Sequence, residues 1–418
     1  MQFKSIASVL LCLCLLTGCA SRLPADPTDG GVPAEALHAL GLTAEQRMED
    51  YEYFWAVLRD SYPCWGVLER TGTDVDAIYQ EYKAMISEHD SDPDFYSAIY
   101  SALWRLGGTG HLWIVEPSAY RAMRAAGGLC DQPGRTHWAE LLEDPATAAG
   151  YERLETMLAM LEDETESGST AAEAAPNVTT LLLPEMKTAY LKVNSFSGDL
   201  EEDGRLLDAF YEELAGYGAL IIDIRENRGG SERYWQELLV APHIDQPLRC
   251  SNYALTRMSA NNRPFLEEAF APEELHPIAE LPDLPALQAS DRALATHYVE
   301  SVLSVSPAAR RSPFRGRIWV LVGSQVYSAS ESFAVFCRET GFASLAGAQT
   351  GGDGIGATDP VFLQLPNSGI LIQFTALFGL NPDGSSNEET GTAPDLPSPA
   401  GEPPLVTALR AIASQKGS

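Results

Sequence analysis

Two short apolar stretches constrain the fold of this chain more than any other feature. Residues 219–225 read A-L-I-I-D-I-R and residues 317–323 read R-I-W-V-L-V-G, and a turn and a helical pattern follow each of them. Stretches of this kind are typical of strands buried on both faces of a parallel sheet that helices cover. With a further strand at 189–196 and helices at 202–214 and 404–414, they predict an α/β core.

The rest of the chain divides by pattern around that core. A capping box at Thr43 and Gln46 opens the first of three amphipathic helices. A mostly helical stretch with an acidic, low-complexity loop at 163–177 follows them, and a variable, proline-rich segment at 240–287 with a helix after it interrupts the core. We therefore expect an N-terminal helical domain at 43–110, a mostly helical insert at 111–180 and an α/β core at 181–418.

The first residues have the pattern of a targeting segment. Lys4 precedes an apolar run at 6–16, which is too short to span a bilayer. The run ends in L-T-G-C-A, which resembles a bacterial lipoprotein lipobox with Cys19 as the lipidated residue; an ordinary secretory signal is the alternative. We expect a signal peptide at 1–18, a tether at 19–42, and an exported protein that Cys19 anchors to the bacterial cell membrane.

The net charge and the cysteine positions of the chain argue against several classes of binding partner. A formal net charge of −30 argues against nucleic acid, whose phosphates require lysine and arginine, and against a lipid surface recognised by charge. Outside the signal and anchor, the cysteines are Cys64, Cys130, Cys250 and Cys337. Their wide spacing without a C-x-x-C motif argues against a zinc site and leaves disulfide pairing open. We expect no metal and no cofactor.

One serine stands at a strand-to-helix turn of the predicted core. Residues 327–331 read Y-S-A-S-E, directly after the strand at 317–323 and before an apolar helix. The unpaired amides and positive dipole end of a helix N-terminus stabilise an anion, as an acyl-transfer nucleophile requires, so Ser328 is a candidate nucleophile. Ser328 and Glu331 also fit a capping box, in which the serine only starts the helix.

One histidine stands on a glycine-rich turn. His111 ends the sequence G-G-T-G-H, which follows the N-terminal helical pattern. The backbone of such a turn, rather than side-chain packing, positions the imidazole. His111 is therefore the candidate base, and a plain surface-loop histidine is the alternative.

Four sequence blocks, in this order, resemble the tail-specific, or C-terminal-processing, peptidases and the related tricorn core proteases. They are D-I-R-E-N-R-G-G at 223–230, Y-S-A-S-E at 327–331, G-A-Q-T-G-G at 347–352 and G-T-A-P-D at 391–395, and G-H at 110–111 also fits. The resemblance covers roughly residues 43–410. It implies a spiral β/α core similar to the crotonase and ClpP folds, and hydrolysis of peptide or protein substrates by a serine nucleophile.

The resemblance also implies roles for individual residues. Ser328 matches the nucleophile that precedes A-S-E. The tail-specific branch has a lysine base where this chain has Asp353, so a Ser–Lys dyad is not available. The tricorn-like branch uses an upstream histidine and a glutamate shortly before G-x-x-P-D, and here His111 and Glu388 occupy those places, with Glu389 as a close rival. The resemblance thus implies a Ser–His–Glu site in which Glu388 orients the imidazole, directly or through an intervening hydroxyl.

Backbone groups complete the implied site. The expected oxyanion hole consists of the amides of Ala329 and of Gly229 or Gly230, and the expected substrate-lining residues are Thr350, Gly351 and Gly352. Glycine is required where a side chain would block a close approach of the backbone.

The sequence therefore predicts an exported, lipid-anchored serine peptidase that works through an acyl-enzyme. No segment resembles a PDZ module, which captures substrate C-termini, so we expect a general protein or oligopeptide substrate. Two alternatives stay open. One is a catalytically inactive member that binds a ligand or peptide, which the missing lysine motivates, and the other is an exported esterase. The oligomeric state is not predicted.

Overall fold

The computed structural model describes residues 35–125, 136–162, 176–356 and 360–415. The predicted signal peptide, Cys19 and most of the tether lie outside the described residues. Cys130 and most of the predicted acidic loop lie outside them too. Within these ranges, no helix is long and apolar enough to cross a membrane.

A six-stranded sheet forms the α/β core. Its strand order is β13-β9-β8-β4-β3-β2; β2 pairs antiparallel with β3, and the other neighbours are parallel. In chain order the strands are β2 (Val178–Leu183), β3 (Thr188–Val193), β4 (Ala219–Asp223), β8 (Arg317–Val322), β9 (Ser344–Gly347) and β13 (Leu396–Pro397). The predicted buried strands are β4 and β8, so the α/β prediction is confirmed.

Helices cover both faces of this sheet, which explains why β4 is apolar throughout. Leu220 and Ile222 enter the core beneath α8 (Leu200–Glu212) and α12 (Ala329–Thr340). Ala219 and Ile221 enter the opposite core, beneath α14 (Pro404–Gln415). Alternate residues of one strand are thus buried on alternate faces, as expected for a parallel sheet between two helical layers.

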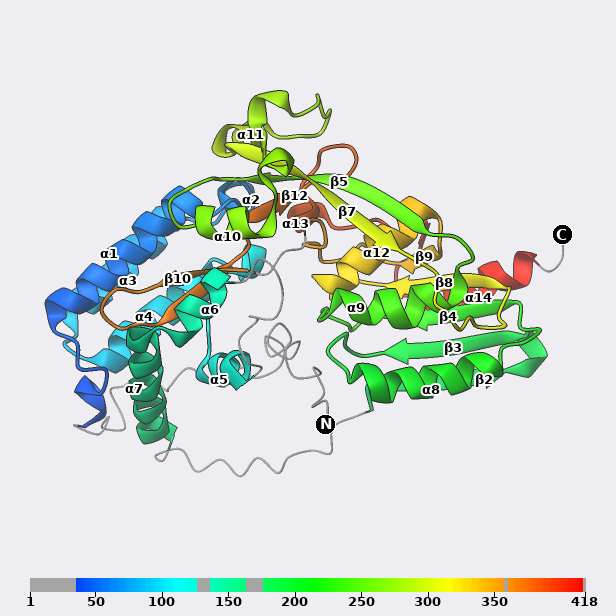
Figure 1. Ribbon diagram of the computed structural model, residues 1–418, viewed down its shortest axis with the longest axis horizontal. Coiled ribbons are helices and arrows are strands. Elements are labelled where there is room, and N and C mark those ends of the chain that lie inside the picture. Colours follow the sequence, from blue (N-terminus) through cyan, green and yellow to red (C-terminus); the bar gives the residue numbers. More distant parts are fainter. Residues whose placement is uncertain (1–34, 126–135, 163–175, 357–359, 416–418) are drawn as a thin grey trace.

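The predicted N-terminal helices form a separate group, which Figure 1 shows on the other side of the molecule from the sheet. The three predicted helices are α1 (Ala44–Ser61), α3 (Val75–Glu88) and α4 (Asp92–Arg105), and the short α2 (Trp65–Arg70), which was not predicted, lies between the first two; α5 (Pro117–Ala125), α6 (Thr136–Glu143) and α7 (Pro145–Glu162) follow. The capping box of Thr43 and Gln46 is present at the start of α1. Their core also includes the predicted hairpin, β10 (Val361–Gln364) and β11 (Leu371–Phe374), which pairs with β1 (Trp113–Ile114).

Two long strands were not predicted. The segment expected to be variable contains β5 (Leu248–Thr256), and β7 (His297–Val305) follows it; the two pair antiparallel over their whole lengths. In Figure 1 this ribbon runs above both the helical group and the sheet. Exposed and partly buried residues alternate over residues 300–304 of β7, as in a strand with one covered face, and the sequence analysis does not predict this strand.

Shorter elements complete the chain. They are η2 (Ala36–His38), η3 (Thr109–His111), η5 (Pro184–Met186), α9 (Glu232–Tyr234), the π-helical turn η6 (Trp235–Val240), η7 (Ala241–His243), α10 (Arg263–Ala269), η8 (Pro272–Glu274), β6 (His276–Pro277), η9 (Ile278–Glu280), α11 (Ala289–Leu294), β12 (Leu377–Gly379) and α13 (Asn387–Thr390). Among the described cysteines, Cys64, Cys250 and Cys337 are free thiols.

Candidate active site

Ser328 occupies a strained turn between the C-terminal end of β8 and the start of α12. Its φ of 59° and ψ of −128° lie in a region that residues with a Cβ rarely adopt. Its side chain makes no capping hydrogen bond to the helix, so the capping-box reading of Ser328 and Glu331 is wrong. Glu331 instead accepts hydrogen bonds from Asn387 at 3.0 Å and Thr392 at 2.6 Å. The backbone of the turn therefore sets the direction of the Ser328 hydroxyl, which makes no hydrogen bond to the amides of α12.

The turn before β1 positions His111. Gly110 and His111 both have positive φ, of 60° and 55°. A Cβ on Gly110 would lie 2.8 Å from Cγ2 of Thr375 and 2.9 Å from Sγ of Cys64, so this position requires glycine. Thr375 N–H donates to the carbonyl oxygen of Gly110 at 2.7 Å. The imidazole is held from the backbone side, as the glycine-rich turn predicts.

His111 connects a hydroxyl to a carboxylate. Its Nε2 lies 3.2 Å from Oγ of Ser328, and its Nδ1 lies 2.5 Å from Oδ2 of Asp353. A carboxylate at Nδ1 holds the proton on that nitrogen and leaves Nε2 free to accept the serine proton. The side chain of His111 is 10% exposed and that of Asp353 is 8% exposed, so bulk water screens this pair little.

Asp353 is the residue that the sequence reasoning missed. It stands where the tail-specific branch has its lysine base, so the resemblance assigns it no role beside a histidine base. One signal in the sequence points to Asp353. The lysine base of the tail-specific branch lies beside the nucleophile, and the residue that occupies its position in this chain is expected beside the nucleophile too. The backbone carries a second signal. In the described chain the non-glycine residues with positive φ are Ser328, His111, Asp353 and Lys187, and the first three form this constellation.

Glu388 was expected to orient the imidazole directly or through an intervening hydroxyl, and the structure corrects this expectation: Asp353 makes the contact to Nδ1, and the hydroxyl beside Glu388 leads to Asp353 and not to the imidazole. Glu388, on α13, accepts a hydrogen bond from Gly110 N–H at 3.0 Å through Oε1. The hydroxyl of Tyr327 lies 3.2 Å from Oε2 of Glu388 and 3.2 Å from Oδ2 of Asp353. Burial, and secondarily the charge of Asp353, raises the pKa of Glu388 well above its usual value.

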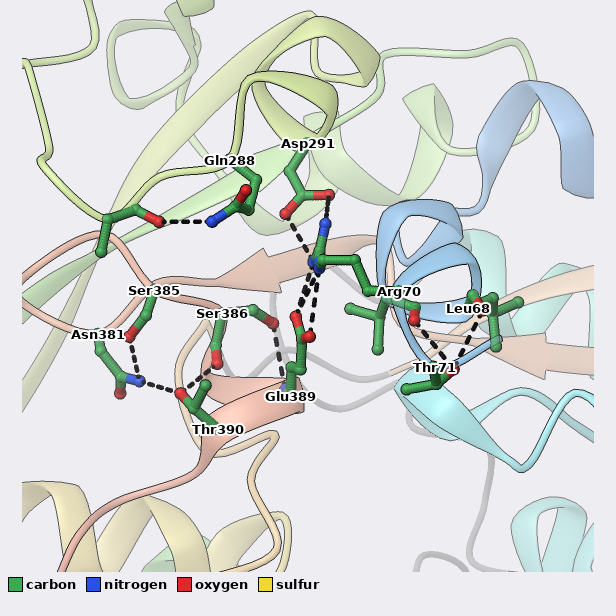
Figure 2. Close-up of polar contacts among 12 residues, drawn as sticks. Leu68, Arg70, Thr71, Gln288, Asp291, Asn381, Ser385, Ser386, Glu389 and Thr390 are labelled. Carbon is green, nitrogen blue, oxygen red and sulfur yellow. Dashed lines mark hydrogen bonds and ion pairs between the residues drawn. The ribbon is translucent and has the colours of Figure 1, made fainter. Parts of the chain in front are cut away.

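The rival, Glu389, faces another partner. Figure 2 shows its carboxylate directed at Arg70 of α2, which also binds Asp291 of α11. Nε of Arg70 lies 2.9 Å from Oε2 of Glu389, and its Nη2 lies 2.9 Å from Oδ2 of Asp291. Glu389 thus joins α13 to the N-terminal helices, and it is engaged away from the imidazole.

The glycine loop at 229–230 lies against the nucleophile turn. A Cβ on Gly229 would lie 3.0 Å from N of Ala329 and 3.0 Å from Cβ of Ser328. The N–H of Gly229 donates to Oδ1 of Asn227 at 2.9 Å, which favours Gly230 as the second oxyanion donor. Ala329 carries the first amide of α12, which has no acceptor within the helix. Ala329 and Gly229 are therefore next to Ser328, Gly230 follows directly in the chain, and the bond to Asn227 distinguishes the two glycines.

The predicted substrate-lining block reaches the turn through its backbone. Ser328 N–H donates to the carbonyl oxygen of Gly352 at 3.1 Å, and Gly351 N–H donates to that of Val326 at 2.7 Å. The side chain of Thr350 is buried and bonds the backbone of Thr392, with Thr392 N–H donating to its Oγ1 at 2.6 Å. The block therefore supports the nucleophile turn by main-chain contacts.

No group of three or more histidine, cysteine or carboxylate side chains able to hold a metal ion occurs among the described residues. The arrangement that does occur is a hydroxyl, an imidazole and a carboxylate in line, beside a helix N-terminus and a glycine loop. Its chemistry is nucleophilic attack on a carbonyl carbon with general-base assistance.

Comparison with known proteins agrees with this chemistry. The model of peptidase family S41 matches residues 187–398, just over half of the chain. A protein from Parabacteroides merdae, described as a candidate peptidase, superposes with a TM-score of 0.50 at 19% identity, over 90% of this chain and 96% of its own. Mature CPAF in complex with lactacystin superposes with a TM-score of 0.51 at 13% identity, over 89% of this chain and 98% of its own. Among curated proteins, no sequence matches this chain.

Proposed function

The chain belongs to peptidase family S41, and we propose that it hydrolyses peptide bonds through a Ser328–His111–Asp353 site. Family membership makes it a serine-type peptidase that acts on peptides or proteins. One observation carries the assignment of residues: His111 lies within hydrogen-bond distance of both Ser328 and Asp353, and an unusual backbone conformation holds each of the three.

In the acylation step, Nε2 of His111 removes the proton of Ser328 while Oγ attacks the scissile carbonyl carbon. A new C–O bond forms, and the carbonyl electrons move onto oxygen. The amides of Ala329 and Gly230 would stabilise that oxyanion, and a donor of this kind contributes about 3–4 kcal/mol to the transition state. The imidazolium then gives its proton to the leaving amine as the C–N bond breaks, which leaves an ester on Ser328.

Deacylation reverses these roles. His111 removes a proton from water, the hydroxide attacks the ester carbon, and the C–O bond to Ser328 breaks as that oxygen regains its proton. The carboxylate of Asp353 stabilises the imidazolium that forms in each half of the reaction. This role explains how an aspartate can stand at the lysine position of the related branch. The histidine is the base, and the aspartate orients the histidine and stabilises its charged form.

Active-site labelling tests the proposal without knowledge of the substrate. We expect a fluorophosphonate probe to modify wild-type protein at Ser328, and the Ser328→Ala and His111→Ala variants to remain unlabelled while folded. A folded wild type that stays unlabelled between pH 6 and 9 would support the alternative of an inactive, ligand-binding member. Turnover of matched peptide and ester substrates would separate a peptidase from an esterase.

We also propose that the protein is exported and anchored through a lipid on Cys19. The sequence supports this proposal, with Lys4, an apolar run and L-T-G-C-A at the start of the chain. The expected result is incorporation of labelled palmitate into the full chain in a bacterial host, and its loss in Cys19→Ala. Unlabelled protein released in soluble form would instead indicate an ordinary secretory signal.

The substrate is proposed to be a general protein or an oligopeptide rather than a tagged C-terminus. Between α4 and β2, the described residues form the short strand β1 and the helices α5, α6 and α7, and these do not provide a strand-edge groove of the PDZ kind. A peptide library with free and amidated C-termini tests this proposal. Equal cleavage of the two forms is expected, and strict dependence on a free carboxylate would contradict it.

A further inference from the structure

The hydroxyl of Tyr327 lies between two carboxyl groups. It is 3.2 Å from Oδ2 of Asp353 and 3.2 Å from Oε2 of Glu388. A phenol has one proton and can donate one full hydrogen bond. If both carboxyl groups were ionised, one of these contacts would join two acceptors. Two ionised carboxylates would have to share the one phenol proton and would repel each other at this distance, so the arrangement favours a second proton, carried by Asp353 or by Glu388.

The surroundings of Glu388 disfavour a negative charge on it. The titratable groups that act on Glu388 are Asp353, Glu331 and Tyr327, and Tyr62 and Cys64 also face it. None of these five groups carries a positive charge, and burial together with the charge of Asp353 outweighs the hydrogen bond from Tyr327, so the pKa of Glu388 is raised. Arg70 belongs to the same region, but it binds Glu389 and Asp291.

Asp353 has the opposite environment. Its Oδ2 lies 2.5 Å from Nδ1 of His111, which donates to it and becomes positively charged during the reaction. A carboxylate that accepts from an imidazole is stabilised in its ionised form. Between the two acids, Glu388 is therefore the one that takes the proton.

The contacts also indicate which oxygen carries this proton. The hydroxyl of Tyr327 lies 3.3 Å from Oε1 and 3.2 Å from Oε2 of Glu388, but only Oε1 also accepts from Gly110 N–H, at 3.0 Å, so Oε1 acts as the carbonyl oxygen. Oε2 can then bear the proton and donate it to the oxygen of Tyr327. Tyr327 in turn donates to Oδ2 of Asp353, so each of these contacts joins one donor to one acceptor.

We propose that Glu388 is a neutral carboxylic acid in the active enzyme, and that it holds Tyr327 and the turn of His111 in place while Asp353 carries the single negative charge. Glu388 is a positioning residue in this arrangement, because it reaches the imidazole through Gly110 and through Tyr327. The inference rests on the proposed Ser328–His111–Asp353 site and assigns the proton within it.

Substitution of Glu388 tests the proton assignment. Glutamine resembles a protonated glutamate, since its oxygen can accept from Gly110 and its NH₂ can donate to Tyr327. We expect Glu388→Ala to lower the rate of fluorophosphonate labelling by about 10²-fold or more, which is the scale expected for a misplaced general base. Glu388→Gln should restore most of that loss, to within about tenfold of wild type. A loss in Glu388→Gln as large as in Asp353→Asn would overturn the inference.

Infrared spectroscopy provides a readout that a purely structural role would not change. A protonated carboxyl has a carbonyl stretch that a carboxylate lacks. In the difference spectrum between wild type and Glu388→Gln at neutral pH, we expect the loss of one such band; the difference removes the contribution of other buried acids, such as Glu331. A band that disappears in Asp353→Asn and persists in Glu388→Gln would place the proton on Asp353 and reject the inference.

Failure of the proposed function gives a different result. If wild type does not label with the probe, the peptidase assignment of Ser328 and His111 fails. The infrared band can still be measured on the folded protein, so the protonation of Glu388 is decided by the spectrum alone.

Discussion

The side chains of His111 and Ser328 meet at 3.2 Å, although the two residues are 217 positions apart in the chain. His111 comes from the turn that follows the N-terminal helices, and Ser328 comes from the turn between β8 and α12. The base and the nucleophile thus belong to two separately packed groups of elements. Docking of these groups is a condition for activation of the serine.

The contact between His111 and Asp353 leads to the first prediction. Asp353→Asn keeps the shape of the side chain but removes the charge that fixes the tautomer of His111. We expect the labelling rate of Ser328 to fall by roughly 10³–10⁴-fold with little change in thermal stability. Asp283, which is exposed, offers a matched control, and Asp283→Asn should label like wild type. An active Asp353→Asn variant would mean that another group orients the imidazole.

The second prediction concerns the glycine loop. Gly229 has a φ of 106°, and an added Cβ would lie 3.0 Å from N of Ala329. We expect Gly229→Ala to displace the oxyanion donors and to lower the labelling rate by about 10²–10³-fold. Gly216 has a φ of 84° and open space around it, so Gly216→Ala introduces backbone strain alone. That control should lose about 1 kcal/mol of stability and retain its labelling rate.

Arg70 gives a prediction about the stability of the contact that joins α2 to α11 and α13. It binds Glu389 and Asp291, and the side chain of Asp291 is 1% exposed. Arg70→Ala leaves that buried carboxylate without its ion-pair partner, so we expect a loss of about 3 kcal/mol in the free energy of unfolding. The exposed pair of Arg263 and Glu267 is the comparison, and Arg263→Ala should change stability by less than about 0.5 kcal/mol. Urea unfolding of both variants measures the difference, and equal effects would contradict the prediction.

A buried histidine makes stability depend on pH. His243 packs between the rings of Tyr211 and Phe314, and neither of its nitrogens has a hydrogen-bond partner among the described residues. Burial, followed by the charge of Arg315, lowers its pKa from 6.5 to about 4. Between these two pH values, the unfolded chain binds a proton that the folded chain does not. Stability should therefore fall by about 3 kcal/mol as the pH decreases from 6.5 to 4.

The His243→Leu variant tests that pH dependence. Its unfolding free energy should lose that part of the slope between pH 6.5 and 4. Thermal or urea unfolding across this pH range provides the measurement. An unchanged slope in His243→Leu would show that other groups cause the acid sensitivity.

Local sequence patterns determined much of the fold. The strands at 219–225 and 317–323 were recognisable because residues buried on both faces must all be apolar. The capping box of Thr43 was recognisable because its partners are three residues apart. Ser328 and His111 were recognisable because each stands in a turn whose backbone is encoded nearby. These features depend on neighbours in the chain, which the sequence displays directly.

Only the tertiary structure determined which carboxyl group contacts Nδ1 of His111. Asp353 and Glu388 are 35 positions apart, both lie beside the nucleophile turn, and either carboxylate could in principle bind an imidazole. The choice depends on differences of a few ångströms, which the packing of α13, the glycine block and the turn of His111 sets together. It also depends on burial, which determines where a charge can persist. Local sequence specifies neither the distance between remote segments nor the burial of a side chain between them. The protonation and the partners of these two acids are therefore determined only by the folded structure.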